Sequence, residues 1–182
     1  MINKPDFDKA LSNKTDYSST LGFTEGQRKA YNALIEFINS PYNPSDYKRA
    51  LIGYAGTGKT YLVKALIRNC NLSYSTINLA APTHKACRIL AESIKLPNIK
   101  VTTMASDLGF KPNYDASKFD INNPPFDAKN KPKLLERRPQ LYIMDEASMI
   151  GRGELTFIER FCKQIKCKII FIGKLIADVK FL

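Results

Sequence analysis

Residues 52–61 read IGYAGTGKTY, and this stretch decides the fold. Its residues 53–60 match G-x-x-x-x-G-K-[ST], a pattern that makes a phosphate-binding loop when it lies between a strand and a helix. The apolar run ALIG leads into it, and the helical pattern KTYLVKALIRN leads out of it. Glycines let backbone N–H groups turn inward, and the positive end of the helix completes a cradle for phosphates. The predicted nucleotide-binding residues of the loop are Gly53, Ala55, Gly56, Thr57, Gly58, Lys59, Thr60 and Tyr61.

Two residues of this loop have separate predicted roles. Lys59 is expected to reach the β- and γ-phosphates, and the Thr60 hydroxyl is expected to ligate Mg²⁺. The alternative is a glycine-rich turn between a strand and a helix that binds no ligand.

A second stretch, LYIMDEAS at 141–148, supplies two adjacent acids at the carboxyl end of an apolar strand. A Mg²⁺-bound nucleotide needs a carboxylate across from the threonine hydroxyl and a base that orients the attacking water. Asp145 is predicted as the carboxylate on the metal side, so the predicted metal ligands are Thr60 and Asp145. Glu146 is predicted as the general base, and with Lys59 these acids form the predicted catalytic set of a nucleoside-triphosphate hydrolase. Two acids that cap a helix are the alternative.

The order of elements predicts an α/β fold of one domain over residues 21–182, after a flexible polar lead-in at 1–20. A helix is expected over about 25–39, because Thr24 and Gln27 have capping-box spacing and an apolar face follows them. Strands and helices then alternate, which predicts a parallel sheet with helices on both faces. The expected strands lie at 50–53, 75–82, 141–146 and 167–173, and the expected helices at 59–69, 83–95 and 153–165. Residues 110–140, with five prolines, are expected to leave the core as a small inserted segment.

Composition narrows the class of protein and its partners. The net charge of +11 points to a polyanionic partner, because binding phosphates with Lys and Arg releases counterions. No run approaches the roughly eighteen apolar residues that cross a bilayer, so a membrane partner is not expected. The start of the chain has no secretory pattern, so a cytoplasmic location is expected. Four cysteines without paired spacing and one histidine make a zinc site a poor interpretation, and the thiols are expected to be reduced.

Four blocks together resemble the superfamily 1 helicases of the RecD-like and Dda-like branch, the latter from bacteriophages. They are FTEGQRKAYNAL, GYAGTGKT, LAAPTHKACRIL and MDEASM, in the family's order, and the resemblance covers about residues 21–173. It implies a RecA-like domain that uses ATP and Mg²⁺ to move along single-stranded DNA, 5′ to 3′. It also implies that Gln27 binds ATP by reading the adenine.

The resemblance assigns residues to the DNA strand as well. LAAPTHKACRIL is similar to the family's motif Ia, which places Pro82, Thr83, His84 and Lys85 against single-stranded DNA. VTTMASDLGF is similar to its motif Ib, in which Thr103 and Ser106 donate to phosphates. Ala105 stands where that motif has a histidine, which weakens the expected contact.

The inserted segment 110–140 lies where these helicases carry subdomain 1B, a hairpin that separates the duplex. By this likeness Phe119 and Phe126 are candidates for a tip that stacks on DNA bases. The alternative is a loop whose aromatic rings pack back on the domain.

After residue 173 the sequence departs from the family. Lys174 stands where the family has an aspartate, and residues 178–182 recover only part of the motif that senses the γ-phosphate. We expect this sequence to be the first motor domain alone, weakly active until a second RecA-like domain or a replication or recombination protein completes it.

Two alternatives stay open beside the helicase interpretation. One is a non-motor module that binds ATP and nucleic acid and needs a partner domain. The other is an unrelated P-loop ATPase or kinase, which would show no preference for single-stranded DNA. The pathway, replication, recombination or repair, is left open, and a phage origin suits the Asn-, Lys- and Ile-rich composition.

Overall fold

A computed structural model describes residues 22–127 and 132–174 of the chain. The predicted lead-in at 1–20, the partial motif at 178–182 and a short part of the inserted segment lie outside the described residues. The described part forms one parallel sheet in the order β1-β5-β4-β2-β3. Its strands are β1 (Lys48–Ile52), β2 (Ile77–Ala81), β3 (Lys100–Thr103), β4 (Leu141–Met144) and β5 (Lys168–Gly173).

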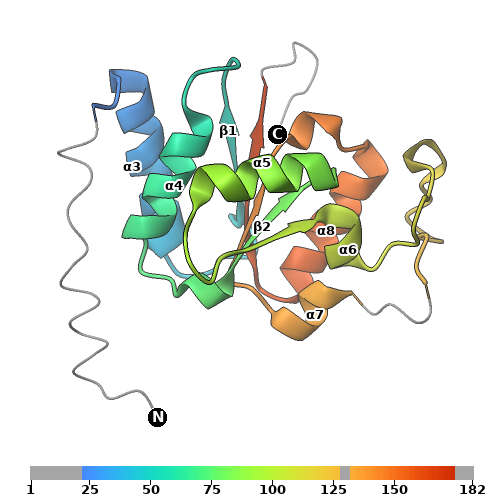
Figure 1. Cartoon of the computed structure of the whole chain (residues 1–182). Helices are drawn as coiled ribbons and strands as arrows, with labels where there is room; N and C mark the ends of the chain where they lie inside the picture. Colours follow the sequence, from blue (N-terminus) through green and yellow to red (C-terminus); the bar gives the residue numbers. More distant parts are fainter. Residues whose placement is uncertain (1–21, 128–131, 175–182) are drawn as a thin grey trace.

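Helices cover both faces of the sheet, as predicted (Figure 1). The helices α3 (Glu25–Asn39), α4 (Lys59–Asn69) and α5 (His84–Ile94) share one core with the sheet. A second core includes α6 (Met104–Leu108), α7 (Lys133–Arg137) and α8 (Arg152–Gln164). Single turns of 3-10 helix occur at Tyr74–Thr76, Ala116–Lys118 and Ala147–Met149. The α/β fold with a parallel sheet is therefore confirmed.

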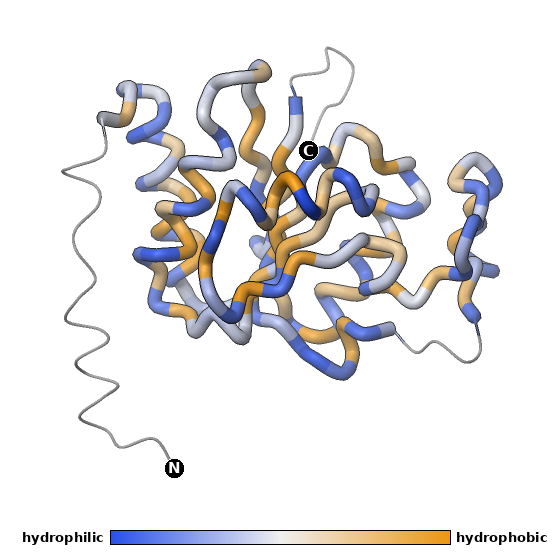
Figure 2. The backbone as a smooth tube through the Cα atoms, in the orientation of Figure 1, coloured by the Kyte–Doolittle hydropathy of each residue, from blue (hydrophilic) through white to orange (hydrophobic). Residues whose placement is uncertain are grey.

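The buried strands divide their side chains between the two cores. In β4, Leu141 and Ile143 belong to the core under α3 and α4, whereas Tyr142 and Met144 belong to the core under α8. Successive side chains of a strand point to opposite faces, so a strand that is covered on both faces is apolar at every position. Figure 2 colours the backbone by residue hydropathy and shows apolar residues gathered on the strands and on the inner sides of the helices.

Local signals set the helix starts as the sequence predicts. Thr24 caps α3 in a capping box with Gln27, and Thr83 caps α5 by accepting from the Ala86 N–H. The strand β3 and the short helix α6 were not predicted. The four residues of β3 are too few for a clear alternating pattern, and the pairing with β2 that stabilises them cannot be read from local sequence.

The inserted segment is anchored beside α8. Its two arms meet where Phe110 and Phe126 form an antiparallel bridge, and the Lys111 N–H donates to the Pro125 carbonyl over 2.6 Å. Figure 1 shows this segment beside α8, away from α3 and α4. None of the helices within 22–127 and 132–174 has the length and apolar character that a membrane crossing requires.

Candidate functional site

The loop between β1 and α4 is a tight turn that depends on glycine. Gly56 and Gly58 both have φ of 77°, in the left-handed region that glycine adopts without steric cost. A Cβ on Gly53 would lie 2.9 Å from Thr57 Oγ1, so this position also needs glycine. The Thr57 hydroxyl closes the turn by donating to the Tyr54 carbonyl over 2.8 Å.

The helix that follows the loop begins without a side-chain cap. Gly58 stands at its N-cap position and offers no side-chain acceptor to the first N–H groups of α4. These N–H groups and the positive end of the helix dipole favour an anion at this place. Since the loop curves around the same point, the two features form one anion-binding cradle.

Lys59 lies across this cradle. Its ammonium donates to the carbonyls of Gly53 and Tyr54, each over 2.8 Å. Both acceptors are neutral, and hydrogen bonds from an ammonium to an anionic oxygen are stronger than those to a carbonyl. The Lys59 ammonium can therefore exchange these carbonyls for phosphate oxygens with a small movement of its side chain.

Gln27 joins the start of α3 to the loop. Its Oε1 accepts from the Thr24 N–H over 2.9 Å, and its Nε2 donates to the Thr57 carbonyl over 2.9 Å. A Cβ on Gly58 would lie 2.8 Å from this Nε2, so the amide packs directly on the turn. The residue assigned to adenine recognition is thus beside the cradle, about 30 positions before it in the chain.

Asp145 and Glu146 follow β4 at the same edge of the sheet. The Asp145 carboxyl is half-buried, and burial raises its pKa while the charge of Lys59 pulls that pKa down. The Lys59 effect places the acid and the loop in one electrostatic environment. Glu146 takes a left-handed conformation with φ of 52°, and its N–H donates to Asp145 Oδ1 over 2.9 Å. This bond fixes one Asp145 oxygen, and the Glu146 side chain is exposed.

The donor set suits a magnesium ion that arrives with a nucleotide. Mg²⁺ usually keeps several waters and uses one or two protein oxygens together with substrate phosphates. Thr60 and Asp145 supply a hydroxyl and a carboxylate, and both side chains are half-buried at this edge. Among the described residues no group of three or more His, Cys, Asp or Glu could hold a metal by itself. The residues therefore fit a shared metal site better than a closed protein site.

The segment Pro82–Lys85 follows β2 at the same edge as the loop, because all five strands are parallel. Thr83 uses its hydroxyl to cap α5, accepting from the Ala86 N–H over 3.1 Å. His84 and Lys85 are exposed at the first turn of α5 and leave their side chains to solvent. A hydrogen bond of 2.8 Å from the Asp145 N–H to the Ala80 carbonyl joins the two predicted sites through their strands.

Thr103 and Ser106 have structural partners that the sequence does not reveal. Thr103 is buried and caps α6, because its hydroxyl accepts from the Ser106 N–H over 3.2 Å. The Thr103 hydroxyl therefore has a structural role as a cap, and its contact with DNA phosphates stays a prediction. The Ser106 hydroxyl accepts from the Lys133 ammonium over 2.9 Å, so a cation from α7 stands at the position assigned to motif Ib.

Phe119 and Phe126 do not form an exposed tip in this structure. Both are half-buried, and both rings pack against Phe110 and Phe157, with centroids between 5.4 and 6.0 Å apart. Phe161 completes a cluster of five rings, and packing in such a cluster stabilises Phe119 and Phe126 more than exposure to water would. The alternative, in which the aromatic rings of the insertion pack back on the domain, is the arrangement observed.

Two features of this region were missed. The Tyr54 ring is 72% exposed at the centre of the loop, and only its place at a variable position of the motif could have marked it. Asp107 is completely buried on α6, and its Oδ2 accepts from Thr102, Asn78 and Tyr142 over 2.5, 2.7 and 3.2 Å. An acid inside the short apolar run MASDLGF was the only available signal.

Comparison with known proteins agrees with the geometry. A family model described as an AAA domain matches residues 23–175, which include the cradle, both acids and the end of β5. No curated protein matches the chain. The match covers most of the 182 residues, and the five-stranded parallel sheet with its phosphate-binding loop is the expected architecture. The chain belongs to the AAA-domain family of P-loop NTPases.

Proposed function

We propose that this protein binds ATP with Mg²⁺ and hydrolyses it as the first motor domain of a superfamily 1 DNA helicase of the RecD-like and Dda-like branch. One observation carries the proposal. The nucleotide cradle, the acids Asp145 and Glu146, and the segment Pro82–Lys85 lie at the carboxyl ends of strands in one parallel sheet. Ligands of open parallel sheets bind at this edge. The AAA-domain match supports the nucleotide part of the proposal.

The residues have distinct tasks at the nucleotide. The loop N–H groups hold the α- and β-phosphates, and Lys59 exchanges the Gly53 and Tyr54 carbonyls for oxygens of the β- and γ-phosphates. Glu146 is proposed to accept the proton of the attacking water, because it follows Asp145 at the carboxyl end of β4 and its side chain is exposed. When it is bound, Mg²⁺ neutralises charge on the phosphate oxygens, and Thr60 and Asp145 would hold it.

The nucleic-acid strand is proposed to lie over the start of α5. Thr83, His84 and Lys85 present a hydroxyl, an imidazole and an ammonium there, which suit phosphates and bases. The hydrogen bond between the Asp145 N–H and the Ala80 carbonyl offers a direct route for coupling. If a bound DNA strand shifts the segment after β2, this hydrogen bond would shift the backbone of Asp145 with it.

A second RecA-like domain is part of the proposal as a partner. In this class of motor an arginine from a neighbouring domain stabilises charge in the transition state, and such an arginine contributes about 10³–10⁵ in rate. The domain alone is therefore expected to bind ATP and to turn it over slowly. The direction of movement, 5′ to 3′, is proposed from the resemblance alone.

A second candidate is a non-motor module that binds ATP and nucleic acid. The bonds that Gln27 and Lys59 make within the loop support this candidate as well, because an ordered cradle can bind ATP whether or not the domain belongs to a motor. The two candidates differ in coupling, since only the motor needs hydrolysis that responds to the DNA strand.

The test is ATP hydrolysis and ATP binding by the purified chain, with and without single-stranded DNA, beside Lys59→Ala. Hydrolysis that single-stranded DNA increases, and that Lys59→Ala abolishes, would support the motor. ATP and DNA binding without hydrolysis, with ATP binding weakened in Lys59→Ala, would mark a domain that needs a partner. Adding a second RecA-like domain should then restore DNA-stimulated hydrolysis in the motor but not in the non-motor module. Binding of neither ligand would refute both candidates.

A further inference from the structure

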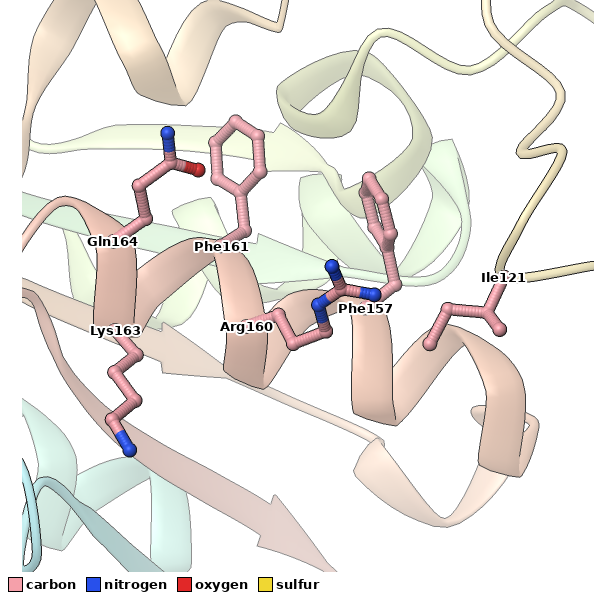
Figure 3. Close-up of a pocket in the computed structure, with 6 residues that line it drawn as sticks. All are labelled: Ile121, Phe157, Arg160, Phe161, Lys163 and Gln164. Carbon is pink, nitrogen blue, oxygen red and sulfur yellow. The ribbon is translucent and has the colours of Figure 1, made fainter.

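A pocket of about 410 Å³ opens on the second half of α8 (Figure 3). It is lined by Ile121, Phe157, Arg160, Phe161, Lys163 and Gln164. Five of these residues come from α8, and Ile121 comes from the inserted segment. The pocket thus lies at the junction of the insertion and the domain, and no residue of the proposed ATP site lines it.

The apolar wall of the pocket is formed by Phe157 and Phe161, and other aromatic rings pack against it. The Phe157 ring packs on the rings of Phe126 and Phe161 with centroids 5.4 and 5.9 Å apart. Phe161 is buried in the same cluster, and Phe157 is half-buried. Figure 3 shows the two rings projecting from α8 on the same side, with Ile121 across from Phe157. A flat, rigid apolar surface of this kind suits a planar ring, because it loses little conformational entropy when a ligand stacks on it.

The polar rim of the pocket is cationic. Arg160 and Lys163 are exposed, and within 22–127 and 132–174 neither side chain makes an ion pair. No acid of the described part of the chain lines the pocket. In Figure 3 the Arg160 side chain extends along the helix toward Phe157, so a positive charge stands beside the ring.

The nearest acids in sequence are engaged elsewhere. Glu159 lies next to Arg160, but both of its carboxylate oxygens accept from the Lys48 ammonium over 2.9 Å. Asp120 precedes Ile121, and its Oδ1 accepts from the Asn122 N–H over 2.9 Å. Among the described residues, Glu159 is thus paired with Lys48, and Asp120 bonds within its own turn and does not line the pocket.

We propose that this pocket is a second contact for single-stranded nucleic acid, in which one base packs on the Phe157 wall and the flanking phosphates bind Arg160 and Lys163. This inference rests on the proposed function, since it gives the same kind of ligand a second contact on the domain. Cations beside an aromatic surface are the usual chemistry of sequence-tolerant strand binding. The Gln164 amide adds a donor and an acceptor for a base edge. The net charge of +11 favours a polyanion over a neutral ligand.

The test compares two double variants that remove the same charge. Arg160→Gln/Lys163→Gln removes the rim, and Lys95→Gln/Lys100→Gln removes two exposed lysines that do not line the pocket. Binding of a fluorescent oligothymidylate of about ten nucleotides is followed by anisotropy over a series of salt concentrations. Each lost phosphate contact lowers the slope of log K against log salt by about 0.7 for a single strand.

The rim variant is expected to bind the strand about tenfold more weakly at low salt and to lose about 1.4 from this slope. The control variant should lose clearly less affinity for the strand and a clearly smaller part of the salt slope. In addition, an oligonucleotide that carries 5-iododeoxyuridine should cross-link under ultraviolet light to the α8 peptide that contains Phe157. Circular dichroism checks that both variants keep the helix content of the wild type.

Three results would overturn the inference. If the wild type binds the strand and both double variants bind it equally well, the pocket has no part in binding while the proposed function stands. If the wild type does not bind the strand, the pocket inference and the DNA part of the proposed function fail together. If soluble polyglutamate, and not the strand, depends on Arg160 and Lys163, the pocket serves an acidic polypeptide.

Discussion

Phe119 fills the space that a side chain on Gly153 would need: a Cβ on Gly153 would lie 2.6 Å from Phe119 Cδ1. The inserted segment therefore packs closely on the first turn of α8. The Tyr114 hydroxyl also donates to the buried Glu154 carboxylate of that turn. Burial and this carboxylate raise the Tyr114 pKa far above its ordinary value, so the phenol stays protonated and remains a donor.

Replacing Gly153 by alanine should lower the free energy of unfolding, although alanine is the better helix former. Glycine to alanine in a helix normally gains up to about 1 kcal/mol, whereas extra volume in a packed site costs about 1–3 kcal/mol. Urea unfolding measures the balance. The matched control is Gly26→Ala, also at the second position of a helix, where a Cβ meets nothing within 4 Å.

A double-mutant cycle isolates the Phe119 contact. In a Phe119→Ala background the methyl group of Gly153→Ala has room, so the substitution should be neutral or stabilising. A loss of the same size in both backgrounds would show that the cost does not come from the ring.

The nucleotide loop was predictable because its signal is local. The glycine spacing and the helical pattern of residues 59–69 lie in one continuous stretch, and the structure places α4 over those residues. The same holds for the capping box of Thr24 and Gln27. Sequence patterns of this kind describe contacts within a few residues of each other, which the chain itself enforces.

The structure of the insertion and of motif Ib was harder to predict from the sequence, because the residues that they contact are distant in the chain. Phe119 and Phe126 read equally well as an exposed tip or as core, and Phe157 on α8 decides between these. Thr103 can serve a phosphate or a helix N-terminus with the same hydroxyl. Only the position of α6 shows which it serves here. The residues at the carboxyl edge of the sheet are predicted to bind ATP and DNA, and these roles stay predictions.

Lys168 is a buried cation that stabilises the end of α3. Its ammonium donates to the carbonyls of Phe37, Ile38 and Ser40, over 3.1 Å in the case of Ile38. Lys168→Met keeps most of the volume but leaves these carbonyls without a charged donor. The free energy of unfolding, measured in urea, should fall by about 1–3 kcal/mol.

Lys48→Met is the comparison for Lys168→Met, because Lys48 lies on the neighbouring strand β1 and makes a partly exposed pair with Glu159 of α8. It should cost less than about 1 kcal/mol. A Lys168→Met protein as stable as the wild type would mean that burying the ammonium costs as much as its hydrogen bonds return.

Asp107 should make the stability of the domain depend on pH in an unusual direction. Burial raises the pKa of this carboxyl above the ordinary 3.8, although Thr102, Asn78 and the Arg137 charge pull the pKa down. The folded state therefore binds this proton at a higher pH than the unfolded state does. Its contribution to stability is present in full below pH 3.8 and is lost as pH rises through the folded pKa.

Asp107→Asn removes that titration, so the stability of the wild type relative to the variant should increase as the pH falls toward 3.8. Urea unfolding at a series of pH values measures it. Asp46→Asn provides a control of opposite sign, because the hydrogen bond from Arg49 lowers the Asp46 pKa. Below pH 3.8 the stability of the wild type relative to Asp46→Asn should decrease, because the unfolded state then binds more protons at this carboxyl than the folded state does. A decrease for Asp107 as well would contradict the assigned effect of burial.

Gln27 should affect nucleotide affinity separately from its role as a helix cap. Gln27→Met loses both the bond to the Thr24 N–H and the bond to the Thr57 carbonyl, whereas Thr24→Ala loses only the cap. Both variants should lose about 0.5–2 kcal/mol of stability. Only Gln27→Met should also bind ATP more weakly, by about 2- to 10-fold for one lost hydrogen bond, and lose preference for ATP over GTP. Titration calorimetry with both nucleotides gives these affinities.

Equal losses of ATP affinity in the two variants would mean that Gln27 acts through the cap alone. No loss in either variant would mean that Gln27 is not part of the nucleotide site.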